Sequence, residues 1–298
     1  MSTLTLSLST VTAAGFDRWD VLVAAGLLTG GAIYATGVGR LWSQAGRWHG
    51  FTPARIAAYL GGVATIIVAL LSPLDTLSDL LFSAHMSQHE LLMLVAAPLL
   101  VIGRPIAALL WALPRRARDR VTAGMRAPIP RRAWRIVSDP VVIMLLHAAA
   151  LWIWHVPWLF EGAMAHAAVH ALQHACFFFT AALFWYALAE GRYGRGGYGM
   201  AALFVFLTSL HSGLLGTLLT LSGRLWYPIY GVRAPSTGVD ALEDQRLAGL
   251  LMWIPTGVLF MVLGLGFFAA WMGEAERRAV KRERRPATAP SDVELSLQ

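Results

Sequence analysis

The residues best suited to chemistry in this sequence are histidines that recur at helical spacing inside apolar segments. His85 and His89 are four residues apart, and His166, His170 and His174 continue the same spacing in a later segment. Side chains four apart lie on one face of an α-helix, so each set would present its imidazoles together. Neutral imidazole is the commonest protein ligand of transition metals. The spacing therefore predicts a metal site shared by two helices.

Neighbouring residues indicate which metal such a site would take. Met86 adjoins His85, and a thioether beside imidazoles suits copper, particularly Cu(I), although Met86 could equally fill a core. We expect the metal ligands to come from six residues: His85, Met86, His89, His155, His170 and His174. Five more could orient these ligands or relay an ion: Glu90, His147, His166, His211 and Asp244. For Glu90 and Asp244, packing and a helix start are the simpler alternatives.

The composition requires that these residues lie in a membrane protein. The chain has 298 residues, of which 57% are hydrophobic and 14% are charged, well below the quarter typical of soluble domains. A soluble enzyme is therefore excluded, and a polytopic membrane protein is expected. Alternating strand patterns are absent, and hydrocarbon requires each backbone polar group to be paired internally, so the spans should be helices.

Seven apolar segments organise the chain into one membrane domain. We predict an all-α bundle of seven transmembrane helices in a domain covering residues 1–273. Residues 274–298 should form a basic cytoplasmic tail, disordered beyond about Pro286. The predicted spans are residues 21–42, 54–71, 80–102, 140–155, 166–189, 200–221 and 247–272.

The arginines predict how the bundle is oriented. The net charge is +7, and the basic residues concentrate in the first, third and fifth loops and in the tail. Because cytoplasmic loops carry the excess of Lys and Arg, the N-terminus should lie outside and the C-terminus in the cytoplasm. These arginines would meet anionic lipid rather than nucleic acid. In this orientation eight of the nine histidines lie between the outer surface and the midplane, and only His49 falls in a cytoplasmic loop.

Five short stretches give the sequence a family resemblance. Residues 83–89 (SAHMSQH), 97–105 (APLLVIGRP), 152–157 (WIWHVP), 170–174 (HALQH) and 244–253 (DQRLAGLLMW) resemble the seven-helix CtaG-type cytochrome c oxidase assembly factors. The resemblance implies a non-enzymatic protein of the bacterial plasma (inner) membrane that helps to mature haem-copper oxidase. It would supply copper to the oxidase catalytic subunit, its main partner, with an extracytoplasmic copper chaperone as a further partner.

Two other functions remain open from the sequence. The same histidines could be axial ligands of a haem in a membrane redox protein, although the predicted cluster is shallow and crowded for that role. A transporter of metal ions or small molecules would place its site near the midplane, where His147 and His211 are expected. An internal repeat, which many transporters have, is not visible.

Overall fold

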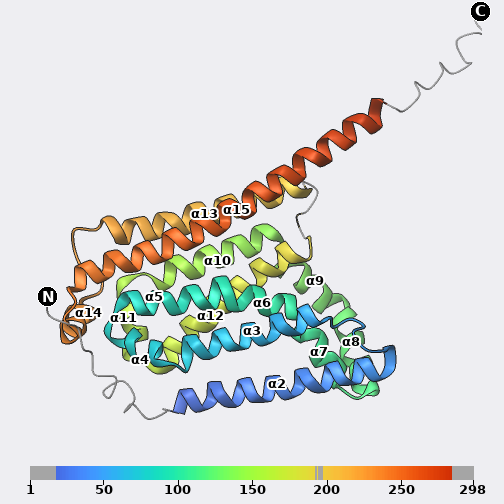
Figure 1. Ribbon diagram of the computed structural model, residues 1–298, viewed down its shortest axis with the longest axis horizontal. Coiled ribbons are helices and arrows are strands. Elements are labelled where there is room, and N and C mark those ends of the chain that lie inside the picture. Colours follow the sequence, from blue (N-terminus) through green and yellow to red (C-terminus); the bar gives the residue numbers. More distant parts are fainter. Residues whose placement is uncertain (1–17, 192, 194–196, 284–298) are drawn as a thin grey trace, which may run out of the picture.

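The computed structural model describes residues 18–191, 193 and 197–283, and these residues form helices and connecting turns without strands. The long helices lie roughly side by side in one bundle (Figure 1). They are α2 (Arg18–Ala45), α3 (Pro53–Leu70), α10 (Pro140–Trp154), α12 (Ala167–Ala189), α13 (Gly197–Leu221) and α15 (Ala241–Glu283), together with a continuous helical span made of α5 (Phe82–Glu90), η1 (Leu91–Ala96) and α6 (Ala97–Gly103).

Shorter helices close the two ends of the bundle. One end carries α4 (Pro73–Leu80), α11 (Pro157–Ala165) and α14 (Pro228–Arg233), which continues into the 3-10 turn η3 (Ala234–Thr237). The other end carries α7 (Pro105–Ala112), α8 (Arg115–Arg126) and α9 (Pro128–Val137) (Figure 1). The long helices therefore run alternately between one end and the other.

Among the described residues, six helices are long and apolar enough to cross a membrane, or seven if one bent pair counts as a single span. The bent pair is α9 with α10, which meet at 63°. Alone, α10 has 15 residues. That length gives a rise of about 22 Å, against a hydrocarbon core of about 30 Å. The fourth predicted span, residues 140–155, corresponds to α10, which alone is shorter than the hydrocarbon core is thick.

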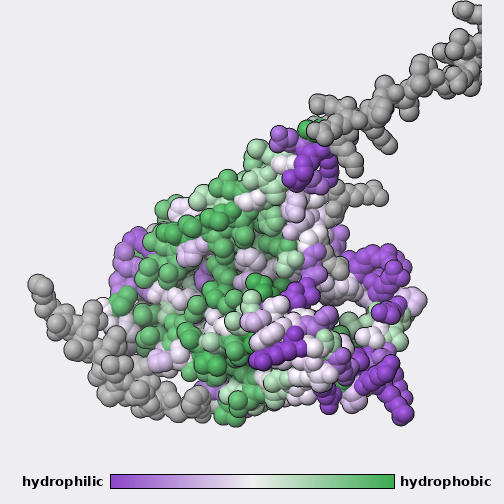
Figure 2. Space-filling view, turned by 45° about the vertical axis from the view of Figure 1, so that its right-hand side comes forward, coloured by the Kyte–Doolittle hydropathy of each residue, from purple (hydrophilic) through white to green (hydrophobic). Residues whose placement is uncertain are grey.

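The surface of the bundle suits a lipid environment. Large apolar side chains point outward along the long helices, as Leu28, Phe179 and Leu265 do. On the face shown in Figure 2, hydrophobic residues cover the middle of the molecule and hydrophilic residues gather towards one end. The arginine-rich helices α8 and α9 lie at the same end as the C-terminal part of α15 (Figure 1). Which end faces the cytoplasm stays a prediction from the charges.

The last helix extends further than the predicted seventh span. α15 continues to Glu283, well beyond residue 272, so the first part of the expected tail is helical. The stretch beyond Pro286, where we expect disorder, lies outside the described residues.

A π-helical segment, η1, interrupts the third span directly after His89. The Ala97 N–H bonds to the Leu92 carbonyl, five residues back, instead of the Met93 carbonyl, and the next residue, Pro98, has no N–H to offer. The Trp185 indole N–H of α12 donates to this Met93 carbonyl at 2.8 Å. An inter-helix hydrogen bond thus satisfies the acceptor that the irregular turn leaves unpaired.

Candidate metal centre

Four histidines from α5 and α12 meet inside the bundle. His85 and His89 face His170 and His174, as their shared spacing predicts. The ring centroids lie 4.4 Å apart for His85 and His89, 5.0 Å for His85 and His170, 5.0 Å for His89 and His174, and 4.3 Å for His170 and His174. Each ring therefore contacts at least two others, and we call these four residues the outer cluster.

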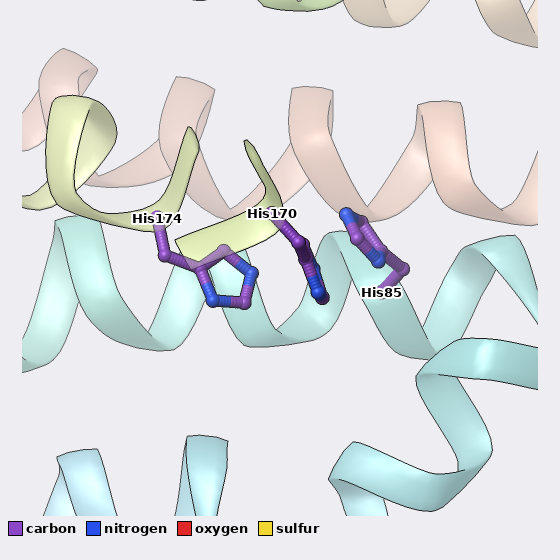
Figure 3. A group of neighbouring side chains, drawn as sticks. All are labelled: His85, His170 and His174. Atoms are coloured by element: carbon purple, nitrogen blue, oxygen red, sulfur yellow. The ribbon is translucent and has the colours of Figure 1, made fainter. Parts of the chain in front are cut away.

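The ring spacing suits a shared metal ion. Nitrogen atoms of His85, His170 and His174 all lie within 4.8 Å of one another. Figure 3 shows these three rings in a row between α12 and α5. Imidazole nitrogens bind such ions at about 2 Å, so ring centres around a tetrahedral ion are roughly 5 Å apart. The centroid distances from His85 to its partners in this triad are 5.0 and 5.9 Å, close to that value.

The nitrogens of the outer cluster are buried without hydrogen-bond partners. His85 is fully buried, and the exposed fractions of His89 and His174 are 1% and 9%. Both ring nitrogens of His85 and His89, and the Nε2 atoms of His170 and His174, lack any partner in the described part of the chain. Leaving a buried polar group unpaired costs about 1–3 kcal/mol. Several such atoms pointing into one place fit a metal ion, which would use their lone pairs.

His155, at the end of α10, lies beside the outer cluster. Its Nδ1–H donates to the Leu151 carbonyl at 2.6 Å, so the tautomer is fixed and Nε2 keeps a lone pair. That Nε2 is buried and unpartnered. The rings of His155 and His89 both contact Phe177, with centroid distances of 5.9 and 4.7 Å. His155 and His89 therefore share Phe177 as a neighbour.

Met86 and Glu90 lie in different surroundings. Met86 is fully buried among the apolar side chains of the core, with Phe82 and Trp154. Glu90 accepts a hydrogen bond of 2.9 Å from the Thr256 hydroxyl of α15. Among the described residues no hydrogen bond joins Glu90 to an imidazole. Glu90 thus links two helices, and the structure provides no support for its expected role in orienting a histidine.

Asp244 of α15 holds the helix that carries His85 and His89. Its carboxylate accepts hydrogen bonds from the backbone N–H of Phe82 at 2.6 Å and of Ser83 at 3.3 Å, and from the Ser83 hydroxyl. The residue before α5 is Leu81, whose side chain cannot cap a helix, so a carboxylate from another helix supplies the cap. Asp244 is 2% exposed and acts on the cluster through the position of α5.

Gln88 fixes the same helix from its other side. Its amide Nε2 donates to the Ala69 carbonyl and to the Asp75 carboxylate, both at 2.8 Å. These bonds tie α5 to the end of α3 and to α4. The two histidines of α5 are therefore carried by a helix anchored at its start and near its end.

Buried aromatic residues pack together at the end of the bundle next to the outer cluster. Phe82, Phe160 and Tyr227 pack together, with ring centroids 4.1–5.4 Å apart. The Tyr227 hydroxyl donates to the His155 carbonyl at 2.9 Å, and the Tyr230 hydroxyl donates to the Ser78 carbonyl at 3.0 Å. Burial raises the pKa of both phenols above the ordinary value, so they remain neutral donors. This layer shields the cluster from bulk water.

The remaining predicted histidines lie apart from the four-ring contact. His166 is exposed at the start of α12, where its Nδ1 lies 3.1 Å from the Gly162 carbonyl. His147 of α10 and His211 of α13 contact each other, with centroids 6.3 Å apart. His49 is exposed in the turn after α2, consistent with the expected surface position.

Sequence reasoning missed Gln173, which lies between His170 and His174. It is fully buried, and neither its amide nitrogen nor its amide oxygen has a partner among the described residues. A strongly polar side chain inside a predicted span was the available signal. Such a side chain could hydrogen-bond a metal-bound imidazole or a passing ligand.

A sequence comparison decides the family. The profile of the cytochrome c oxidase caa3 assembly factors (Caa3_CtaG) matches residues 32–274. The chain belongs to this family. The match contains every histidine of the outer cluster and confirms the resemblance seen in the short motifs. The family is described as assembly factors of cytochrome c oxidase caa3, and such assembly factors are typically not enzymes.

The curated relatives found by comparison are described as uncharacterized proteins. An uncharacterized protein of Mycobacterium leprae is 23% identical over 288 residues, which cover 94% of this chain and 43% of the relative. Uncharacterized proteins of Mycobacterium bovis and Mycobacterium tuberculosis are each 25% identical over 291 residues, covering 93% of this chain and 42% of those proteins. The chain thus spans less than half the length of these relatives. No solved structure matches it.

Proposed function

We propose that this chain binds copper, as Cu(I), in the outer cluster and delivers it to the catalytic subunit of a haem-copper cytochrome c oxidase during assembly. The observation that carries the proposal is the set of buried, unpartnered imidazole nitrogens on α5 and α12. An assembly factor for a copper enzyme has a reason to keep such a site. The fit of the residues to an ion, and family membership, support the same conclusion.

The charge of the site favours a monovalent ion. The four residues of the outer cluster are neutral donors, and the nearby Asp244 is occupied by the start of α5. The cost of moving an ion out of water rises with the square of its charge, so a buried set of neutral ligands favours a monovalent over a divalent ion. Imidazole suits copper, and hard cations such as Mg²⁺ and Ca²⁺ prefer oxygen ligands.

Transfer would proceed by ligand exchange without a change of oxidation state. In this proposal an ion arrives from the outer side of the bacterial plasma membrane, from an extracytoplasmic chaperone, and passes near His155 and the exposed His166. The outer cluster then holds it away from water. The oxidase subunit would approach through the lipid and replace the imidazoles one at a time. Met86, buried in the adjoining core, could add its thioether to the ion.

Copper titration of the purified protein in detergent tests the proposal. Cu(I) is offered in competition with a chromophoric chelator such as bicinchoninate, to wild type and to the His85→Ala, His89→Ala and His49→Ala variants. Loss of a ligand from the cluster should lower affinity about tenfold or more, by analogy with the 10–100-fold effect of residues that orient metal ligands. His49→Ala, the matched control, should bind as wild type does.

Two results would count against the proposal in different ways. Equal affinity in all four proteins would remove the outer cluster as the copper site. Weaker binding in the cluster variants, with unchanged oxidase maturation in cells, would leave the site in place and refute its role in assembly. An optical spectrum with a Soret band in the purified protein would favour the haem alternative instead.

A further inference from the structure

A second pair of histidines lies deeper in the bundle than the outer cluster. His147 is on α10, eight residues before His155, which corresponds to a rise of about 12 Å along the helix. Its ring contacts that of His211 on α13, with a centroid distance of 6.3 Å and an interplanar angle of 66°. We call these two residues the inner pair. Neither belongs to the four-ring contact of α5 and α12.

The hydrogen bonding of His147 leaves one nitrogen for another partner. Its Nδ1 lies 3.1 Å from the Thr180 hydroxyl of α12. That hydroxyl donates its single hydrogen to the Cys176 carbonyl at 2.8 Å, so it can only accept from His147. The His147 Nδ1 therefore carries the proton, and Nε2 carries a lone pair. Metal-binding histidines are commonly oriented by a hydrogen bond of this kind on the other ring nitrogen.

His211 brings two nitrogens with no partner at all. Both Nδ1 and Nε2 are buried, and neither has a hydrogen-bond partner in the described part of the chain. His147 is itself 6% exposed. The inner pair therefore combines an oriented imidazole with an unsatisfied one, inside a span where polar side chains are costly to keep.

The separation of the two rings distinguishes the inner pair from the outer cluster. Two imidazoles on opposite sides of one ion, each with a metal–nitrogen bond of about 2 Å, have ring centres about 6 Å apart. The observed distance is 6.3 Å, whereas the contacts within the outer cluster are 4.3–5.9 Å. A pair of imidazoles at this ring separation suits Cu(I), which readily takes a linear two-coordinate arrangement.

We propose that His147 and His211 form a second Cu(I) site, two-coordinate and deeper in the membrane than the outer cluster. The proposal rests on the proposed function, because Cu(I) would occupy both the outer cluster and the inner pair. α12 joins them: it carries His170 and His174 of the outer cluster and Thr180, which orients His147. A two-ligand site leaves the ion open to an incoming ligand, which suits a carrier that must release its cargo.

The test measures Cu(I) stoichiometry and coordination in three purified proteins. They are wild type, a variant with His85, His89, His170 and His174 all changed to Ala, and the same variant with His211→Ala added. We expect two bound equivalents, one equivalent and none. X-ray absorption of the one-equivalent protein should show two nitrogen neighbours. His49→Ala, added to the fourfold variant in place of His211→Ala, is the matched control and should keep its one equivalent.

The possible results separate the two proposals. If His211→Ala removes nothing from the fourfold variant, the inner pair is not a site, whatever the outer cluster does. If the fourfold variant binds as much copper as wild type, the outer cluster and the proposed function fail, while the effect of His211→Ala still decides the inner pair. If the fourfold variant does not fold, the single His211→Ala variant replaces it. Loss of one equivalent then supports the inner pair, and unchanged stoichiometry overturns it.

Discussion

At the scale of single residues, the unusual feature of the described part of the chain is a group of buried imidazole nitrogens without hydrogen-bond partners. Buried histidines in other settings use their nitrogens in hydrogen bonds, as His155 and His147 each do with one nitrogen. His85 and His89 use neither nitrogen. Burying a polar group without a partner costs free energy, and a bound ligand would offset that cost.

The pH dependence of copper binding should report this imidazole chemistry. Only neutral imidazole binds a metal, and the ordinary imidazole pKa is about 6.5, so protons compete below that pH. Burial disfavours the charged form of an imidazole, so we expect Cu(I) affinity to stay level from neutral pH down through about pH 6.5 and to fall only in more acidic solution. A competition titration at several pH values measures it. An affinity that changed only above about pH 8 would show that the ligands are not imidazoles.

At the scale of elements, the outer cluster depends on how α5 is held. The helix has no capping side chain of its own, and its first N–H groups are satisfied by Asp244 from α15. The residues that bind an ion and the residue that positions them therefore come from different parts of the sequence.

Replacing Asp244 by Ala should weaken both the fold and copper binding. The change leaves the N–H groups of Phe82 and Ser83 and the Ser83 hydroxyl without their acceptor, at a cost of about 1–3 kcal/mol in unfolding free energy. Because α5 loses its fixed position, Cu(I) affinity should fall with it. Thermal unfolding and competition titration measure the two effects.

Asp240→Ala is the matched control for this prediction. Asp240 is also an aspartate at the start of α15, where it accepts hydrogen bonds from the Leu242 and Glu243 N–H groups, both at 3.0 Å. Its loss should cost about 0.5–2 kcal/mol as a helix cap and leave copper affinity unchanged. If both variants bound copper as wild type does, α5 would not need its cap to hold the site.

The π-helical segment after His89 makes a second prediction at this scale. Trp185→Phe keeps an aromatic ring but removes the N–H that satisfies the Met93 carbonyl, so unfolding free energy should fall by about 0.5–1.5 kcal/mol. Chemical denaturation in detergent measures the change. Trp158→Phe, at a tryptophan that is 73% exposed, should have no comparable effect. Equal stability of the two variants would mean that the irregular turn needs no partner from α12.

At the scale of the whole molecule, the arrangement of charge predicts orientation. The arginines of α8 and α9 lie at one end of the bundle, and α4, α11 and α14 at the other (Figure 1). If the arginine-rich end faces the cytoplasm, the aromatic layer over the outer cluster faces outward.

Reporter fusions test this orientation directly. A reporter that works only in the cytoplasm should be active when fused after residue 285, and one that works only outside should be active when inserted within residues 72–79. These two sites lie on opposite sides of the membrane if the prediction is right. A tail accessible from outside would invert the protein and place the histidines near the cytoplasmic face.

The sequence by itself determined the class of protein and predicted the four histidines that meet in the outer cluster. Apolar runs of span length have few structural alternatives in hydrocarbon, because only internal hydrogen bonding is available there. The spacing of His85 with His89, and of His170 with His174, followed from helix geometry alone. The two pairs could be expected to meet because they lie at matching depth in the third and fifth predicted spans.

Only the tertiary structure decided which side chains meet across helices. Glu90 pairs with Thr256, and Asp244 caps α5, although each pair is more than 150 residues apart in the sequence. Periodicity shows which face of a helix is polar, but not which other helix covers that face. The contact between His147 and His211 and the bend between α9 and α10 likewise depend on which helices pack together. Local spacing in the sequence does not encode that packing.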